Sequence, residues 1–269
     1  MKLYLLGLLF VLGLVTTFIT LDAELFQPKE TTTKPPQTYN WDEGHTFMMY
    51  NVQTLGRTKI SNTTERDILV NLVHDQDFSV LQEVRDITNE TKDTLRKHVH
   101  PDFEIHESER KGRTSYKESM FFIWNTSLFS VQEPIYHFED AEDIYEREPY
   151  VMNVSYSDGW FYLVSSHVQP RSAETEIPAL LQETASLNHT YLLIGDLNAD
   201  CSFFDASQKP ESEDVTWIIP TGVDTTVADS RCTYDRIITN DNSLFSGYAV
   251  YDQGMQISDH YPIATRMIQ

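Results

Sequence analysis

Short apolar stretches alternate with polar ones from residue 45 to the C-terminus. Stretches rich in β-branched and aromatic residues favour strands, and the chain has eight: residues 45–52, 78–84, 119–124, 150–156, 160–168, 191–197, 234–239 and 261–268. Residues 61–75 and 173–187 favour helices; in the first, Ile68, Leu69 and Leu72 recur at helical spacing. Several strand candidates follow one another without a helix between them. We therefore expect mixed sheets packed on each other in one α/β (α+β) domain, and not a doubly wound parallel sheet.

The first 44 residues have a different pattern. Residues 1–20 contain one Lys followed by an apolar run, which is typical of a secretory signal peptide, with a membrane signal-anchor as the alternative. The Thr- and Pro-rich residues that follow lack apolar periodicity, as exposed linkers do. We expect a signal peptide at residues 1–22, a linker at 23–44 and one folded domain at 45–269.

Sequons and cysteines agree with export. Five Asn-x-Ser/Thr triplets favour a glycosylated, extracellular protein; they begin at Asn62, Asn89, Asn125, Asn153 and Asn188. In an oxidising compartment, an even pair such as Cys201 and Cys232 forms a disulfide more often than two free thiols.

The formal net charge of −21 argues against a general nucleic-acid coat protein, because phosphate binding rests mainly on Lys and Arg. It does not exclude a nuclease. Bound divalent cations and a few well-placed arginines reverse the charge locally, since salt screens the more distant acids.

Polar residues at the ends of the apolar stretches are the candidates for chemistry. In residues 192–201 a buried-strand pattern ends in Asp196 and Asn198, which point the same way from an extended chain. Taken singly, such residues form turns and strand caps. Similar groups recur along the chain: Asn51, Gln82, Glu83, His167, Asp235, Asp259 and His260. As a set, they combine oxygen ligands suited to Mg²⁺ with histidines that titrate near neutrality, which favours hydrolysis of a phosphate ester.

Nine motifs extend this interpretation: YNVQTLG, LQEVRD, GRTSYKE, EREP, SSHVQP, GDLNADC, DTTV, CTYDRI and SDHYPI. These motifs occur in the same order in the deoxyribonuclease I family of secreted endonucleases, which the sequence resembles from about His45 to the C-terminus. The whole endonuclease/exonuclease/phosphatase superfamily shares GDxN and SDH, whereas SYKE, CTYDRI and DTTV together separate the sequence from abasic-site endonucleases, neutral sphingomyelinases and inositol phosphatases. The resemblance implies a four-layer sandwich, in which two packed mixed β-sheets are flanked by helices.

The resemblance also implies roles for individual residues. Glu83 is expected to be a principal Mg²⁺ (or Mn²⁺) ligand, and four other residues complete the metal and phosphate pocket: Asn51, Asp196, Asn198 and Asp259. Two histidine–carboxylate pairs, His260 with Asp235 and His167 with Glu118, are expected to transfer protons, with either histidine as the base.

Three further residues match the family's DNA contacts. The resemblance implies that Arg147 contacts a phosphate and that Arg85 and Tyr116 lie at the minor groove, where sequence preference is weak. Outside these motifs, each would be an ordinary surface side chain.

Structural features of the family are only partly kept. Cys201 and Cys232 match its long-range disulfide, but its second, small-loop disulfide is missing. The resemblance implies two sites for structural Ca²⁺. The first lies in a shortened acidic loop, for which the alternative is a solvated surface loop without an ion. The second has Ser where Thr is usual. The residues are Asp140, Asp143 and Glu148 for the first, and Asp224, Thr226 and Ser230 for the second.

The resemblance also bears on a protein partner. The family binds actin through an apolar strand ahead of SYKE, and here residues 102–112 carry acids and a His instead of aliphatic residues. We expect weak actin binding or none.

The implied function is a secreted, monomeric endonuclease without a membrane anchor, dependent on Mg²⁺ (or Mn²⁺) and stabilised by Ca²⁺. It would cut double-stranded DNA with low sequence preference to 5′-phosphorylated products. One alternative is another phosphodiesterase or phosphatase of the superfamily, acting on a sphingolipid or an inositol phosphate. The other is a non-catalytic DNA-binding relative, although every expected catalytic position is filled.

Overall fold

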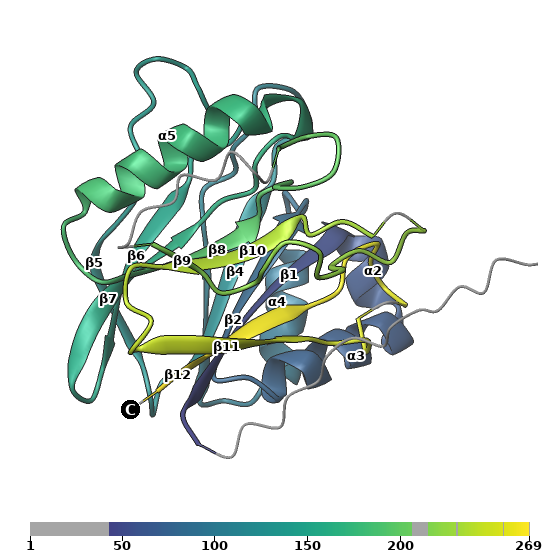
Figure 1. The fold of residues 1–269 in the computed structure, drawn as a ribbon. Helices are drawn as coiled ribbons and strands as arrows, with labels where there is room; N and C mark the ends of the chain where they lie inside the picture. Colours follow the sequence, from purple (N-terminus) through teal and green to yellow (C-terminus); the bar gives the residue numbers. More distant parts are fainter. Residues whose placement is uncertain (1–42, 206–214, 230, 255, 269) are drawn as a thin grey trace, which may run out of the picture. The chain divides into compact units, whose positions relative to one another are not determined.

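Two six-stranded β-sheets form the centre of the fold (Figure 1). The computed structural model describes residues 43–205, 215–229, 231–254 and 256–268, all within the unit Pro36–Gln269. The expected signal peptide lies outside the described residues, as does all of the expected linker except Glu43 and Gly44.

In the first sheet the strands lie in the order β11-β12-β1-β2-β4-β3. Their bounds are β1 His45–Leu55, β2 Phe78–Val84, β3 Phe103–Glu107, β4 Ser119–Asn125, β11 Phe245–Val250 and β12 Ile263–Met267. Strands β1 and β2 run parallel, because helices α2 (Arg57–Ser61) and α3 (Thr63–His74) return the chain between them. The other strand pairs of this sheet are antiparallel, so the sheet is mixed.

The second sheet repeats this plan in the order β5-β6-β7-β8-β10-β9. Its strands are β5 Ser130–His137, β6 Tyr150–Tyr156, β7 Gly159–Ser165, β8 Tyr191–Asp196, β9 Thr216–Trp217 and β10 Asp235–Thr239. Here β7 and β8 are the parallel pair, joined through the 3₁₀ turn η1 (Pro170–Ser172) and helix α5 (Ala173–Ser186).

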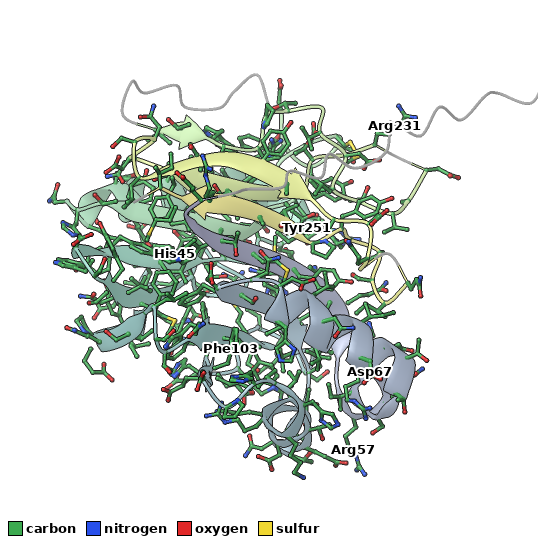
Figure 2. The ribbon with its side chains drawn as sticks, turned by 90° about the horizontal axis from the view of Figure 1, so that it is seen from below. His45, Arg57, Asp67, Phe103, Arg231 and Tyr251 are labelled. Carbon is green, nitrogen blue, oxygen red and sulfur yellow. A yellow bond between two sulfur atoms is a disulfide. The ribbon has the colours of Figure 1, made fainter. Side chains whose placement is uncertain are left out.

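Apolar side chains fill three spaces between the layers. Between the sheets, Phe47 of β1 meets Phe161 of β7 edge-on, with ring centroids 5.6 Å apart. Helices α3 and α4 (Glu90–His98) pack on the outer face of the first sheet, and α5 packs on the outer face of the second. The side chains of Arg57 in α2 and Asp67 in α3 point outward (Figure 2). The layer order helix, sheet, sheet, helix confirms the expected four-layer sandwich.

All strands and helices expected from the sequence are present, and their bounds shift by at most three residues. The sequence pattern misses six elements: β3, β5, β9, β11, α2 and α4. Helix α4 buries only Thr91 and Leu95, so it has no helical apolar stripe to detect. Strand β5 lies at a sheet edge and leaves Gln132 and Glu133 exposed, so it lacks the alternation of a half-buried strand.

The cysteine pair is confirmed as a disulfide. Cys201 and Cys232 are 31 residues apart and their Cα atoms lie 5.8 Å from each other. Closing a loop of this length stabilises a fold by roughly 3 to 4 kcal/mol on the chain-entropy model.

The sequons differ in exposure. Asn62, Asn89 and Asn188 are exposed, whereas Asn125 and Asn153 are half-buried. None of the helices in the described ranges is long and apolar enough to cross a membrane.

Candidate active site

The candidate catalytic residues meet where strands of both sheets end. Asn51 and Glu83 lie at the carboxyl ends of the parallel strands β1 and β2, and Asp196 ends β8, the parallel neighbour of β7. The Asn51 Nδ2 atom donates to Asp196 Oδ2 at 3.0 Å, which joins the two sheets at this edge. The site therefore forms only when the two sheets pack.

The backbone around Glu83 is irregular. Its φ is 61°, and the register of β2 shifts there against both neighbouring strands. In β1, Gln53 and Thr54 also have positive φ, 47° and 63°. Such conformations are costly for residues other than glycine and cluster at functional sites. Here they leave Glu83 out of the regular ladder, with its Oε2 accepting the Thr54 N–H at 3.0 Å.

The Asn51 amide holds two carboxylates side by side. Its Nδ2 donates to Glu83 Oε1 at 3.2 Å as well as to Asp196 Oδ2, and its Oδ1 accepts the Gln53 N–H at 3.0 Å. Asn51 and Asp196 are buried and Glu83 is half-buried. Two carboxylates so close repel each other unless a cation is near. Hard oxygen donors of this kind suit Mg²⁺ or Mn²⁺.

His260 is enclosed by carboxylates. Its Nδ1 lies 2.8 Å from Asp235 Oδ2, and its Nε2 lies 3.5 Å from Asp196 Oδ2. Burial lowers the pKa of His260, but the charges of Asp235 and Asp196 outweigh it and raise that pKa to about 10. Burial raises the pKa of Asp235, which is fully enclosed. His260 therefore holds its proton at neutral pH.

The second pair differs in its surroundings. The His167 Nδ1 contacts Glu118 Oε1, and its Nε2 lies 3.6 Å from Asp196 Oδ2. Arg147 Nε lies 3.2 Å from Glu118 Oε1, and Arg85 lies 3.4 Å from Glu118 Oε2. Burial alone would raise the pKa of Glu118, but His167, Arg147 and Arg85 lower it to about 2. The structure thus brings together both expected pairs, with both Nε2 atoms directed at Asp196.

Gln82 joins the two sheets beside the site, and Gly195 of β8 allows a close approach of the chain that follows β7. Gln82 Nε2 donates to Ser165 Oγ at 3.1 Å and to the Ser166 carbonyl at 2.9 Å, while its Oε1 accepts the Asp196 N–H at 3.0 Å. A Cβ atom at Gly195 would lie 1.9 Å from the Ser166 oxygen, so only glycine permits this approach. Gln82 is one of the polar residues expected from the sequence at the strand ends, where it interrupts an apolar run.

Sequence reasoning missed two hydroxyl groups that support His260. Ser258 Oγ accepts the His260 N–H at 3.1 Å and donates to the Asn51 carbonyl at 2.6 Å. Thr225 Oγ1 accepts the Asp235 N–H at 3.1 Å. The Ser258–Asn51 bond joins residues 207 apart in sequence and the Thr225–Asp235 bond joins residues 10 apart, and the hydrophobic pattern predicts neither.

Arg85 and Tyr116 lie together at the rim. The Arg85 guanidinium is 5.5 Å from the centre of the Tyr116 ring, and 69% of Tyr116 is exposed. Arg147 donates from Nε to the His167 carbonyl at 3.0 Å, so it is fixed beside the histidine. The three expected DNA contacts therefore border the site.

The remaining expected metal ligands lie at its edges. Asp259 Oδ1 is 4.0 Å from His260 Nε2, and 56% of the Asp259 side chain is exposed. Asn198 has φ 48°, its N–H donates to Asp196 Oδ1 at 3.1 Å, and its Nδ2 donates to the Val168 carbonyl at 3.0 Å. Both border the pocket, and neither bonds to Glu83 in the structure.

A second grouping with metal-ligand spacing consists of Asp196, Asp235 and His260, whose ligand atoms lie within 4.8 Å of one another. Asp235 is fully buried and hydrogen-bonded to His260, so an ion there would have to break that pair. The half-buried Glu83 beside Asn51 and Asp196 is the more accessible position for a cation.

The acids of the first expected Ca²⁺ site each have a separate partner. Asp140 accepts the N–H groups of Ile144 and Tyr145. Asp143 pairs with Arg113 at 2.9 Å and Glu148 pairs with Lys111 at 3.3 Å. Within the described part of the chain, these three acids do not form a group with metal-ligand spacing.

In the second expected Ca²⁺ site, Asp224 Oδ1 accepts the Thr226 N–H at 3.1 Å. Ser230 lies outside the described residues.

Comparison with known proteins places these residues in a family. Residues 48–260 match the Endonuclease/Exonuclease/phosphatase family. Deoxyribonuclease-1 of Bos taurus is 32% identical over 252 residues, which cover 80% of this chain and 89% of that protein. Deoxyribonuclease-1 of Homo sapiens is 32% identical over 251 residues with the same coverage.

Solved structures share the fold at lower identity. D. rerio TDP2 in complex with a single-strand DNA product has a TM-score of 0.63 and 17% identity, covering 85% of this chain and all of that one. The mannosyl-6-phosphatase of Bacteroides thetaiotaomicron has a TM-score of 0.58 and 14% identity, covering 84% of this chain and all of that one. One of these proteins is thus bound to a DNA product and the other is named as a phosphatase, and both share the fold.

The family match spans most of the described fold, and relatives more than 30% identical extend over four fifths of the chain. The chain belongs to the endonuclease/exonuclease/phosphatase family and, within it, to the deoxyribonuclease I group.

Proposed function

We propose that this protein is a secreted, divalent-metal-dependent endonuclease that hydrolyses double-stranded DNA with little sequence preference and leaves 5′-phosphorylated ends. Its relatives named Deoxyribonuclease-1 support DNA as the substrate. The observation that carries the proposal is the convergence of His167 Nε2 and His260 Nε2 on Asp196, beside the Asn51–Glu83 pair. A phosphate placed there would meet a metal pocket and two proton-transfer groups at once.

Glu83, Asn51 and Asp196 would hold Mg²⁺ or Mn²⁺, with Asp259 and Asn198 at the rim of the pocket. The donor chemistry fits, because these side chains offer carboxylate and amide oxygens. When bound, the cation supplies positive charge to the phosphate oxygens as negative charge develops on them.

The charge around each histidine suggests its role. His260 keeps its proton beside Asp235 and Asp196, so it would donate that proton from Nε2 to the departing 3′ oxygen. His167 faces a carboxylate whose charge is shared with two arginines, so it would accept at Nε2 the proton of the attacking water. The phosphorus–3′-oxygen bond breaks as the water oxygen bonds to phosphorus, which leaves a 5′-phosphate and a 3′-hydroxyl.

Arg147, Arg85 and Tyr116 would contact the DNA outside the pocket. Arg147 is held next to His167, so it would bind the scissile or a neighbouring phosphate. The exposed Arg85–Tyr116 pair offers a cation and a flat ring to the minor groove. Because the whole chain has a net charge of −21, these local cations would decide where DNA approaches.

The direct test is incubation of the purified protein with supercoiled plasmid, with Mg²⁺ or with chelator, alongside sphingomyelin and inositol phosphates. We expect nicked and linear DNA only with the cation, 5′-phosphate ends that a ligase can join, and no turnover of the other substrates. Glu83→Gln should abolish cleavage, whereas Glu139→Gln at an exposed position should cleave normally. Cleavage of a phospholipid or sugar phosphate without DNA cleavage would overturn the proposal.

We also propose a structural Ca²⁺ at Asp224 and Thr226. Asp143 and Glu148 would first have to leave Arg113 and Lys111, so the acidic loop is the weaker site. Millimolar Ca²⁺ should raise the melting temperature, because it binds the native state alone. Asp224→Asn should remove this effect and Asp143→Asn should not.

Two further expectations concern assembly. Strand β3 presents the exposed Glu104 and a His106 that is hydrogen-bonded to Tyr150 at 2.6 Å, which is a poor apolar surface for actin. We expect a monomer that does not bind actin, and co-elution with actin in gel filtration would contradict this.

A further inference from the structure

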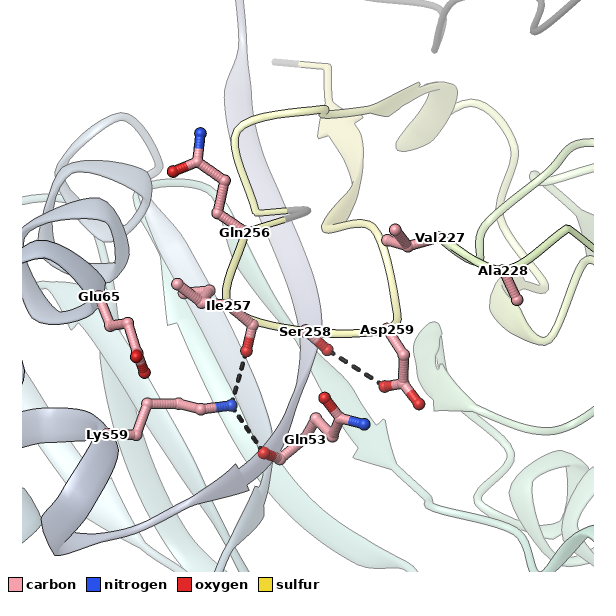
Figure 3. Close-up of a pocket in the computed structure, with 9 residues that line it drawn as sticks. All are labelled: Gln53, Lys59, Glu65, Val227, Ala228, Gln256, Ile257, Ser258 and Asp259. Atoms are coloured by element: carbon pink, nitrogen blue, oxygen red, sulfur yellow. Dashed lines mark hydrogen bonds between the residues drawn. The ribbon is translucent and has the colours of Figure 1, made fainter.

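Lys59 of helix α2 lies beside the candidate active site, on the wall of a cavity of about 480 Å³ (Figure 3). Gln53 of β1 and the segment ahead of β12, which includes Ser258 and Asp259, form much of the rest of the wall. The side chain reaches from the helix toward both of these segments (Figure 3).

The Lys59 ammonium donates three short hydrogen bonds, all to backbone oxygens. Nζ lies 2.6 Å from the Val52 carbonyl, 2.7 Å from the Gln53 carbonyl and 2.6 Å from the Ile257 carbonyl. An ammonium has three donors, so none is left for a phosphate. Among the described residues, no carboxylate forms an ion pair with it. These contacts hold two backbone segments together and leave no donor for a ligand.

These carbonyl groups need a donor because the chain is irregular there. After Asn51 the register between β1 and β2 shifts, and Gln53 and Thr54 adopt positive φ. Backbone oxygens that leave a ladder are costly when they are buried and find no other partner; Val52 and Ile257 are buried, and Gln53 is exposed. Ile257 lies between β11 and β12, outside any strand, so its carbonyl also has no place in a strand ladder.

The two segments that Lys59 joins orient different halves of the site. On one side, the Thr54 N–H bonds to Glu83 and the Gln53 N–H bonds to Asn51 Oδ1. On the other, Ile257 precedes Ser258, whose hydroxyl accepts the His260 N–H. One ammonium thus bonds both to the backbone that presents the metal ligands and to the backbone that presents a histidine, and Ile257 is 198 residues from Lys59 in sequence.

We propose that Lys59 is a positioning residue that sets the distance between the Glu83–Asn51 pocket and His260. This inference rests on the proposed function for its effect on rate, but its effect on metal affinity can be measured without DNA. Arginine should not replace it, because a planar guanidinium cannot direct three donors from one nitrogen at three converging oxygens.

The test compares full-length Lys59→Met and Lys59→Arg with wild type and with Lys97→Met, which removes an exposed lysine at the end of α4. Calorimetric titration with Mg²⁺ should show at least about fivefold weaker binding in both Lys59 variants. In plasmid cleavage, the kcat of both variants should be about 10- to 100-fold lower than that of wild type, and KM should stay within about twofold. A loss of this size is expected when reacting groups are misplaced by about 1 Å. Lys97→Met should match wild type in both measurements.

Three results would overturn the inference. The first is Mg²⁺ affinity and kcat in Lys59→Met within twofold of Lys97→Met. The second is full recovery in Lys59→Arg, which would mean that charge and not geometry matters. If Lys59→Met does not fold, Lys59→Gln supplies the same comparison, and normal affinity and kcat in that variant would be the third. An inactive wild type that binds Mg²⁺ would instead count against the proposed function.

Discussion

The two histidine–carboxylate pairs of the site look alike in sequence but lie in different electrostatic surroundings. Glu118 contacts Arg147 and Arg85 as well as His167, and its pKa falls to about 2 against the effect of burial. Asp235 is fully buried, and its ion pair is with His260. The difference teaches that one carboxylate holds two arginines as well as its histidine, whereas the other forms an ion pair with its histidine alone.

The largest expected effect comes from breaking the second pair. Asp235→Asn should lower kcat by on the order of 10³ to 10⁴, because it removes the charge that fixes the tautomer of the imidazole and keeps it protonated. Asp158→Asn, at an exposed position, is the matched control. Single-turnover cleavage and the melting temperature should be measured on the same samples. A folded Asp235→Asn variant that retains a tenth of the wild-type rate would contradict this role.

The same change in the first pair should cost less. Glu118→Gln should lower kcat by about 10², because Arg147 still holds the His167 carbonyl after the carboxylate charge is gone. The KM for DNA should stay unchanged or fall, because Arg85 and Arg147 no longer pair with the Glu118 carboxylate. Steady-state kinetics against Glu104→Gln, an exposed acid of β3, checks this. A loss as large as that of Asp235→Asn would remove the asymmetry.

Stability should depend on pH in two separate windows. The folded pKa of His260 is raised from 6.5 to about 10, so its contribution is complete below pH 6.5 and is lost as the pH rises through about 10. The folded pKa of Glu118 is lowered from 4.5 to about 2, so its contribution is present above pH 4.5 and is lost as the pH falls through about 2. Each group should change the slope of unfolding free energy by up to about 1.4 kcal/mol per pH unit in its window.

Urea denaturation across the pH range checks these windows in wild type and variants. His260→Gln should flatten the curve only in the alkaline window, and Glu118→Gln only in the acidic one. Flattening of the same window by both variants would mean that the pairs are one coupled system.

The smallest expected effect is on the dependence of DNA binding on salt. Because Arg147 belongs to the first pair and is the expected phosphate contact, Arg147→Gln should reduce the slope of log affinity against log salt by about 0.9, the value for one phosphate contact. Lys97→Gln on α4 should leave the slope unchanged. Affinity measured between low and physiological salt with chelator present gives the slope, and an unchanged slope in Arg147→Gln would mean that this residue does not contact a DNA phosphate.

The sequence predicted most of the two sheets because their central strands are continuous apolar runs. Residues that lie together at the candidate site could also be named from the sequence, because motifs such as GDLNADC and SDHYPI lie at strand ends where polar groups interrupt those runs. Helix α4 and strand β5 were missed, since their exposed faces leave no periodic apolar pattern. Lys59 and Ser258 were missed for another reason: each has one partner about 200 residues away, Ile257 for Lys59 and Asn51 for Ser258, and such bonds follow from the packing of segments.

The most direct test of the asymmetry uses DNA in which sulfur replaces the 3′ oxygen at one phosphodiester, because a thiolate leaves without needing a proton. If His260 protonates the leaving group and His167 activates water, His260→Ala should lose on the order of 10² or more in rate on normal DNA but only a few-fold on the sulfur-containing strand, and His167→Ala should lose on both. Equal losses for His260→Ala on the two substrates, or rescue of His167→Ala instead, would contradict the account.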